Sequence, residues 1–278
     1  MSSVVPHKIE RRTSAHSETR DDLIVVEEPL EIRLGYGAEG DRNQLSLSVT
    51  MRTPGNDEEL AIGFLYSEQI ISSASNFLSV KYCDDVGKQE QKENVMRVEL
   101  APDVKLDPAL FKRNFYTTSS CGVCGKASIE QVRFQCQSIS DQLRIKGTIL
   151  NQLPRKLREA QVVFKHTGGL HASALFDLSG NLLFYREDVG RHNALDKLLG
   201  HLVLTQDGNA TEHILLLSGR ISFELVQKAS RANIPIIAAI GAPSSLAVDL
   251  AEELGITLVG FLKEDKFNIY THSKRLDA

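Results

Sequence analysis

The fold class can be predicted from one stretch, residues 213–262, which has the sequence HILLLSGRISFELVQKASRANIPIIAAIGAPSSLAVDLAEELGITLVGFL. It alternates short apolar runs with segments in which apolar residues recur at helical spacing. The apolar runs cover residues 213–217, 234–240 and 256–262, and the helical segments cover residues 223–232 and 246–254. Strands that alternate with helices of about ten residues are typical of βαβ units. Because the apolar runs are unbroken, we predict a parallel sheet that is covered on both faces.

The segment before this stretch adds a hairpin and two helices. The arms of the hairpin are residues 174–178 and 182–186, which Ser179-Gly180-Asn181 joins. Leucines at helical spacing indicate a helix around 194–202, and a basic helix is expected around 154–160. The predicted fold class is therefore α/β, with a core of βαβ units over residues 151–278.

The first half of the chain has a different pattern. Residues 23–118 predict a smaller β-rich α+β subdomain with an antiparallel character, because one run alternates with period two and a helix contains Leu60, Phe64, Leu65 and Ile70. Its predicted strands are residues 23–26, 30–34, 45–51, 77–82 and 95–100. Residues 1–22 are polar and lack periodicity, so we expect a flexible tail. Residues 119–150 are assigned to a cysteine loop and a connecting helix.

Composition narrows the class of protein. The chain has 278 residues, 42% of them hydrophobic and 24% charged, which is ordinary for a globular protein. The formal net charge of −4 argues against a general nucleic-acid binder. The sequence contains no apolar run of membrane-spanning length and no secretory signal, so we expect a cytoplasmic protein without a membrane partner.

The sharpest local feature is a pair of thiols in a loop of small residues, Thr117-Thr-Ser-Ser-Cys121-Gly-Val-Cys124-Gly125. A zinc half-site would need two further ligands, and the sequence offers no second pair at ligand spacing. A thioredoxin-type dithiol would follow a strand of a βαβ unit, and this context does not clearly offer one. A persulfide or acyl carrier needs a nucleophilic cysteine in such a loop, which Cys121 or Cys124 would provide. The remaining alternative is that both cysteines are incidental.

Two predicted strand-to-helix junctions, residues 218–222 and 241–245, have the composition of phosphate sites. Each places a glycine, serine hydroxyls and backbone N–H groups at a helix N-terminus. The polar candidates are Ser218, Gly219, Arg220, Ser222 and Ser244. Parallel neighbouring strands would bring both junctions to one edge of the sheet, where Arg220 adds a bidentate donor. The alternative is that the serines only cap helices.

A third polar turn follows the hairpin, within Glu187-Asp-Val-Gly-Arg-His-Asn193. Asp188 is a candidate acceptor for the N1/N2 edge of guanine, and Arg191 or His192 is a candidate for holding phosphate or assisting proton transfer. His171 lies in a glycine-rich turn and is more often a structural histidine in such a context. It resembles the histidine of zinc deaminases, but Ser173 stands where their glutamate would be, which disfavours deamination.

Five motifs in order resemble the FdhD family of formate dehydrogenase accessory sulfurtransferases. They are CGVCG at 121–125, TGGLHASAL at 167–175, EDVGRHNALDKLLG at 187–200, SGRISFELVQKA at 218–229 and TLVGFL at 257–262. The resemblance runs from about residue 20 to the C-terminus. It implies a cytoplasmic homodimer with a cytidine-deaminase-like core and without catalytic zinc.

The resemblance also implies a function. Such a protein accepts persulfide sulfur from a cysteine desulfurase and passes it to the molybdenum cofactor, bis(molybdopterin guanine dinucleotide), which formate dehydrogenase requires. Cys121 would carry the persulfide, with Cys124 in support, and a GDP-like ligand is possible. The family's cofactor-binding segment falls on Phe261, Leu262, Lys263, Glu264, Asp265 and Lys266. This segment lacks the glycine and arginine that are usual there in the family. It contains the carboxylates of Glu264 and Asp265 instead, which are unfavourable near a phosphate-rich ligand.

Two alternatives from other classes remain open. One is a chaperone that holds the cofactor without moving sulfur. The other is a nucleotide-metabolising enzyme of the deaminase type, which bound zinc would support.

Overall fold

A six-stranded sheet forms the centre of the computed structural model, which describes residues 2–83, 92–104, 106, 139, 143–206 and 208–277. Its strand order is β13-β12-β11-β10-β8-β9. The strands are β8 His171–Asp177, β9 Leu182–Asp188, β10 His213–Leu217, β11 Ile236–Ala239, β12 Thr257–Gly260 and β13 Asn268–Thr271. The three strands of the opening stretch, β10, β11 and β12, are parallel as predicted. The sheet as a whole is mixed, because the β8–β9 hairpin and β13 join it antiparallel.

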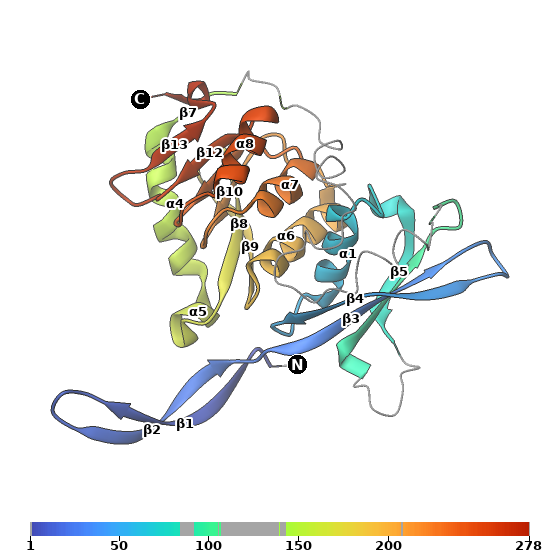
Figure 1. Ribbon diagram of the computed structural model, residues 1–278, viewed down its shortest axis with the longest axis horizontal. Helices are drawn as coiled ribbons and strands as arrows, with labels where there is room; N and C mark the ends of the chain where they lie inside the picture. The colour runs from blue at the N-terminus through green and yellow to red at the C-terminus, as the bar shows by residue number, and fades with distance from the viewer. Residues whose placement is uncertain are drawn as a thin grey trace.

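Helices cover both faces of this sheet (Figure 1). They are α4 Gly147–Ala160, α5 Val162–Thr167, α6 Arg191–Gln206, α7 Phe223–Arg231 and α8 Ser245–Glu253. Along β10 the side chains alternate: Leu215 and Leu217 pack with α6, α7 and α8, whereas Ile214 and Leu216 pack with α4. This alternation follows from the period of a strand, and it confirms the prediction of a sheet buried on both faces.

A second sheet lies in the N-terminal half, in the order β4-β3-β6-β5. Its strands are β3 Glu28–Tyr36, β4 Asn43–Arg52, β5 Phe77–Tyr82 and β6 Val95–Leu100. The helix α1, Asp57–Ser67, connects this sheet to the larger one by packing on α6. A β-carbon added at Gly63 would lie 1.7 Å from the carbonyl oxygen of Asp196, so the two helix backbones touch. One continuous hydrophobic cluster therefore joins both halves, and the mixed α/β fold class is confirmed.

The N-terminal residues differ from the predicted flexible tail. β1 Val4–Arg12 and β2 Ser17–Val25 form an antiparallel hairpin that projects from the body as an arm (Figure 1). The turn is closed by a hydrogen bond from the N–H of Thr13 to the carbonyl of His16 at 2.8 Å. Most side chains on both faces of the arm are exposed, so the strands lack the apolar alternation by which a strand is recognised in sequence.

The remaining elements are short. β7 Ile145–Lys146 pairs in parallel with β14 Leu276–Asp277, and single 3₁₀ turns occur at Ala74–Asn76, Lys92–Asn94 and Ser273–Arg275. Within the described ranges, every helix is too short or too polar to cross a membrane.

Candidate functional site

The loops that follow β10, β11 and β12 meet at the carboxyl edge of the central sheet. The N–H of Gly241 donates to the carbonyl of Gly219 at 3.1 Å, and the N–H of Phe261 donates to the carbonyl of Gly241 at 3.0 Å. Ile221 and Pro243 form an isolated parallel bridge between the first two loops. The two junctions therefore open at one edge, as predicted. This edge is the usual ligand position in an α/β sheet. We call this edge, formed by residues 218–222, 241–245 and 261, the crevice.

The serines of the crevice are largely occupied by structural contacts. The hydroxyl of Ser218 accepts from the N–H of Ala172 at 2.8 Å, and the hydroxyl of Ser244 caps α8 by accepting from Ala247. Ser222, the N-cap residue of α7, makes no side-chain capping bond. The capping alternative is therefore correct for Ser244, and Ser218 joins the loop to β8. Any phosphate contact in the crevice must come mainly from other groups.

Those groups are four basic side chains: His171 itself and the three that act on it, Arg191, His192 and Arg220. Burial of the imidazole, followed by the charges of Arg191, His192 and Arg220, holds the pKa of His171 below its usual range, with Asp188 partly opposing them. His171 also approaches the loop after β10 closely, since a β-carbon at Gly219 would lie 3.2 Å from its Nδ1. His171 therefore lies among these basic side chains, although its sequence context favoured a purely structural role. The clustering of cations favours an anionic ligand.

A carboxylate balances part of this charge. The Nε2 of His192 lies 2.8 Å from an oxygen of Glu224, in the first turn of α7, and 3.4 Å from the hydroxyl of Ser222. Burial acts to raise the pKa of Glu224, but the hydrogen bond with His192 and nearby cations outweigh it and leave that pKa lowered. In the described part of the chain, the Nε of Arg191 and one oxygen of Glu224 are buried without a hydrogen-bond partner. The Nε–H of Arg191 is an unsatisfied buried donor suited to an acceptor of a ligand, whereas the Glu224 oxygen is an unsatisfied acceptor.

Asp188 does not have the role that its sequence context suggested. Its side chain is fully buried, and both oxygens are in use. One oxygen accepts from the N–H of Gly190 at 2.8 Å and from Asn193 at 3.1 Å, while the other accepts from the N–H of Thr53 at 3.1 Å and pairs with Lys197 at 2.7 Å. A carboxylate enclosed in this way cannot read a guanine edge. It fixes the turn that carries Arg191.

The segment 261–266 is only partly at the site. Phe261 is 46% exposed at the end of β12, bonded to the crevice loop through its N–H. Leu262 is buried in the cluster around α4, so its side chain belongs to the core. The N–H of Lys263 donates to the carbonyl of Lys266 at 2.8 Å, which closes a turn whose charged side chains, those of Lys263, Glu264, Asp265 and Lys266, are exposed. Contact between this turn and a cofactor stays a prediction.

The predicted carrier residues Cys121 and Cys124 lie outside the described residues, as does the helix expected after them. Cys83 is buried, in agreement with a hydrophobic role. Among the residues with described positions, three or more His, Cys, Asp or Glu side chains nowhere gather in a way that would hold a metal ion.

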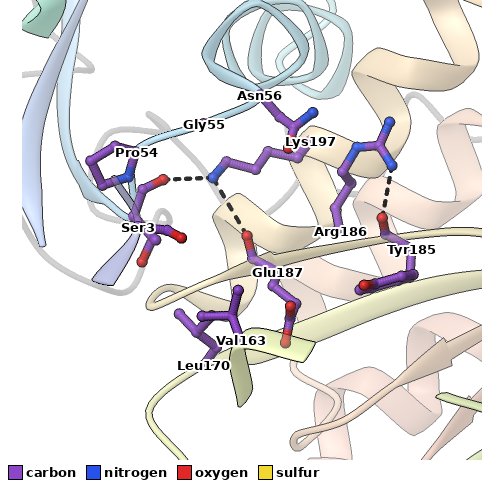
Figure 2. A pocket seen from close by; sticks show the side chains of 11 residues that line it. Ser3, Pro54, Gly55, Asn56, Val163, Leu170, Tyr185, Arg186, Glu187 and Lys197 are labelled. Carbon is purple, nitrogen blue, oxygen red and sulfur yellow. Dashed lines mark hydrogen bonds between the residues drawn. The ribbon is translucent and has the colours of Figure 1, made fainter. Parts of the chain in front are cut away.

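A cavity of about 450 Å³ lies at the outer strand β9 (Figure 2). Its lining includes the turn before α1, β9, α5 and Lys197 of α6. No local sequence pattern could indicate this cavity, because its walls come from segments far apart along the chain.

Fold and site define a class: an α/β protein with a basic crevice at the carboxyl edge of its sheet. Residues 25–277 match the model of the FdhD/NarQ family, and the chain belongs to this family. It is 48% identical to the sulfur carrier protein FdhD of Mycolicibacterium paratuberculosis, over 97% of both chains. Its identity to the sulfur carrier protein FdhD of Streptomyces coelicolor is 47%, over 97% of this chain and 94% of that one.

A solved structure shows the same fold. The crystal structure of a Desulfotalea psychrophila protein, described as a formate dehydrogenase accessory protein, superposes with a TM-score of 0.77. The two chains share 21% sequence identity, and the match covers 99% of this chain and 100% of that one.

Proposed function

We propose that this protein is a sulfur carrier that serves formate dehydrogenase. The observation that carries the proposal is its membership of the FdhD/NarQ family, together with sulfur carrier relatives of up to 48% identity over nearly the whole chain. The CGVCG motif at 121–125 supplies the sulfur-bearing residue that this function requires. We place the protein in the cytoplasm as a homodimer, where a cysteine desulfurase and formate dehydrogenase are its partners.

The proposed uptake step is a sulfur transfer between two thiols. The thiolate of Cys121 attacks the terminal sulfur of the desulfurase persulfide, a new S–S bond forms on Cys121, and the desulfurase cysteine leaves as a thiolate. The outer sulfur of the Cys121 persulfide then passes as sulfide to the molybdenum cofactor, bis(molybdopterin guanine dinucleotide), which is the substrate of the second step. The Cys124 thiolate attacks the inner sulfur, a Cys121–Cys124 disulfide forms as sulfide leaves, and a thiol reductant then reduces this disulfide. Cys124 supports or relays this transfer.

The crevice is the proposed holding place of the cofactor. Its four basic side chains suit the phosphates of a guanine dinucleotide, and Arg220 is exposed and able to pair with a phosphate oxygen. The unpartnered, buried Nε of Arg191 is a further donor for such a group. This interpretation needs no metal held by the protein itself.

The test is a labelling experiment with a cysteine desulfurase and radiolabelled cysteine. Wild-type protein is expected to acquire label that thiol reductants release, and Cys121→Ala is expected to stay at background. Cys83→Ala is the matched control, because the Cys83 side chain is buried and should not take up sulfur.

The same experiment separates the carrier from a cofactor chaperone. A chaperone would bind the cofactor but acquire no releasable label. Full formate dehydrogenase activity in cells that contain only Cys121→Ala would contradict the proposal.

A further inference from the structure

The arm formed by β1 and β2 is a two-stranded sheet that projects from the body, and no other described strand pairs with it (Figure 1). The body holds the base of the arm, since a β-carbon added at Gly169 would lie 3.0 Å from Cγ2 of Val25. Beyond the base, residues 10–21 are all exposed. A hairpin of two strands is only marginally stable in water, whereas sheets of more strands are stable. A further strand would therefore stabilise the arm.

The hydrogen bonds of the arm show which backbone groups face outward. The N–H of Val26 donates to the carbonyl of Ser3 at 3.0 Å, and the N–H of Thr13 donates to the carbonyl of His16 at 2.8 Å. The register between these two bonds is regular, so hydrogen-bonded and non-hydrogen-bonded pairs alternate along the arm. The N–H and C=O groups that point outward are therefore those of the even-numbered residues of β1 and the odd-numbered residues of β2.

The two edges of the arm differ in their suitability for pairing. Pro6 and Lys8 are among the outward-facing residues of β1. Proline has no N–H to donate, and proline and lysine are residues with which proteins protect an exposed edge from pairing. The edge of β2 contains neither of them, and its outward-facing N–H and C=O groups belong to Ser17, Thr19, Asp21, Leu23 and Val25. The edge of β2 is therefore the one that can accept another strand.

A second copy of β2 fits this edge in one register. In an antiparallel pair about a two-fold axis, the outward-facing residues of both strands lie opposite one another. With the axis at Asp21, the nine residues Ser17–Val25 overlap in full. This register also sets Arg20 opposite the partner's Asp22 in a non-hydrogen-bonded pair, where side chains are closest, and the symmetry repeats the pair. The side chains of Arg20 and Asp22 are 42% and 39% exposed, so both can form this contact.

The neighbouring registers bring like charges together. An axis at Arg20 sets Arg20 opposite the partner's Arg20 and Glu18 opposite the partner's Asp22. An axis at Asp22 sets this carboxylate opposite the partner's Asp22. Like charges directly opposite each other destabilise a sheet. At the Asp21 axis the two Asp21 side chains also face each other, but Lys8 of the same arm lies opposite each of them and offsets the repulsion. Charge and overlap therefore select the same register.

We propose that two copies of this protein pair through β2 in this register, so that their arms form one four-stranded antiparallel sheet in the order β1-β2-β2-β1. The interface uses the same surface of both copies, as a closed two-fold dimer requires. About ten backbone hydrogen bonds join the two β2 strands. The proposal rests on the proposed function for the existence of a homodimer, and it names the surface that forms the dimer.

The test is sedimentation velocity, which measures the Kd of the dimer. Thr19→Pro removes an outward-facing N–H of β2 and is expected to raise this Kd about tenfold or more. Glu10→Pro is the matched control, because Glu10 lies opposite Thr19 in the hairpin but on the outer edge of β1, and the Kd should not change. Arg20→Asp sets like charges opposite each other twice and should raise the Kd about tenfold, and Arg20→Asp/Asp22→Arg should restore it.

A cross-link tests the register without reference to stability. In a chain that carries Cys121→Ala and Cys124→Ala, Asp21→Cys sets two thiols opposite each other, with Cα atoms about 5.5 Å apart, which allows a disulfide. Thr19→Cys sets the two thiols on the order of 14 Å apart and should not cross-link. A monomeric wild type, an unchanged dimer in Thr19→Pro, or equal cross-linking at both positions would overturn the proposal. Sulfur label on Cys121 is measured separately, so failure of the carrier function is distinguished from failure of this inference.

Discussion

At the scale of single residues, the carboxylate of Asp188 ties the crevice to the N-terminal half. It accepts from Gly190 and Asn193 at the start of α6 and from Thr53 after β4, and it pairs with the buried Lys197. Asp188→Asn removes the charge that compensates Lys197 and turns one acceptor into a donor that faces N–H groups. Loss of one partner of a buried ion pair costs about 3–5 kcal/mol, so we expect a decrease of that order in the free energy of unfolding.

The measurement is urea denaturation together with GDP and ADP calorimetry. Because Asp188 shapes the turn that carries Arg191, both nucleotides should be weakened alike. The double variant Asp188→Asn/Lys197→Met, which leaves no unpaired buried charge, should recover part of the stability. A variant of normal stability that has lost only its preference for GDP would instead restore Asp188 as a guanine reader.

At the scale of secondary-structure elements, the contact between α1 and α6 depends on two glycines. A β-carbon added at Gly200 would lie 1.8 Å from the carbonyl oxygen of Glu59, and the helix backbones cannot separate without opening the cluster between them. We expect Gly200→Ala to lower the free energy of unfolding by about 3 kcal/mol, since overpacking at a rigid contact exceeds the gain in helix propensity. Leu204→Ala, a partly exposed position on the same helix, should change it little. The measurement is thermal denaturation of both variants, which compares their midpoints with that of the wild type.

Local sequence patterns predicted most of the strands and helices. The burial and contacts of the site residues depend on segments that are far apart in the sequence. The predicted bounds of β5, β6 and β10 are those of the structure. β10 is an apolar run, whereas β5 and β6 mix apolar residues with single polar ones, and polar segments flank all three. α5 was not predicted, since its six residues are too few to show a helical period. At the site, Arg191 and His192 directly follow Gly190 at the start of α6, and Arg220 directly follows Gly219, so all three could be found from local sequence. The burial of Asp188 could not, because it depends on Thr53, which is 135 residues away in the sequence.

At the scale of the whole molecule, one hydrophobic cluster contains residues from both sides of the predicted boundary between the halves. Leu60, Ile62 and Leu65 of α1 belong to the same buried cluster as Leu198 and Leu202 of α6. A fragment of residues 143–278 would leave that face of α6 in water, at a cost of about 25 cal/mol for each Å² of apolar surface. We expect the fragment to bind a hydrophobic dye and to lack a cooperative thermal transition, whereas the full chain unfolds in one step in far-ultraviolet circular dichroism. A sharp transition without dye binding in the fragment would show that the C-terminal core folds independently, and α1 would then be a docked element of a separate domain.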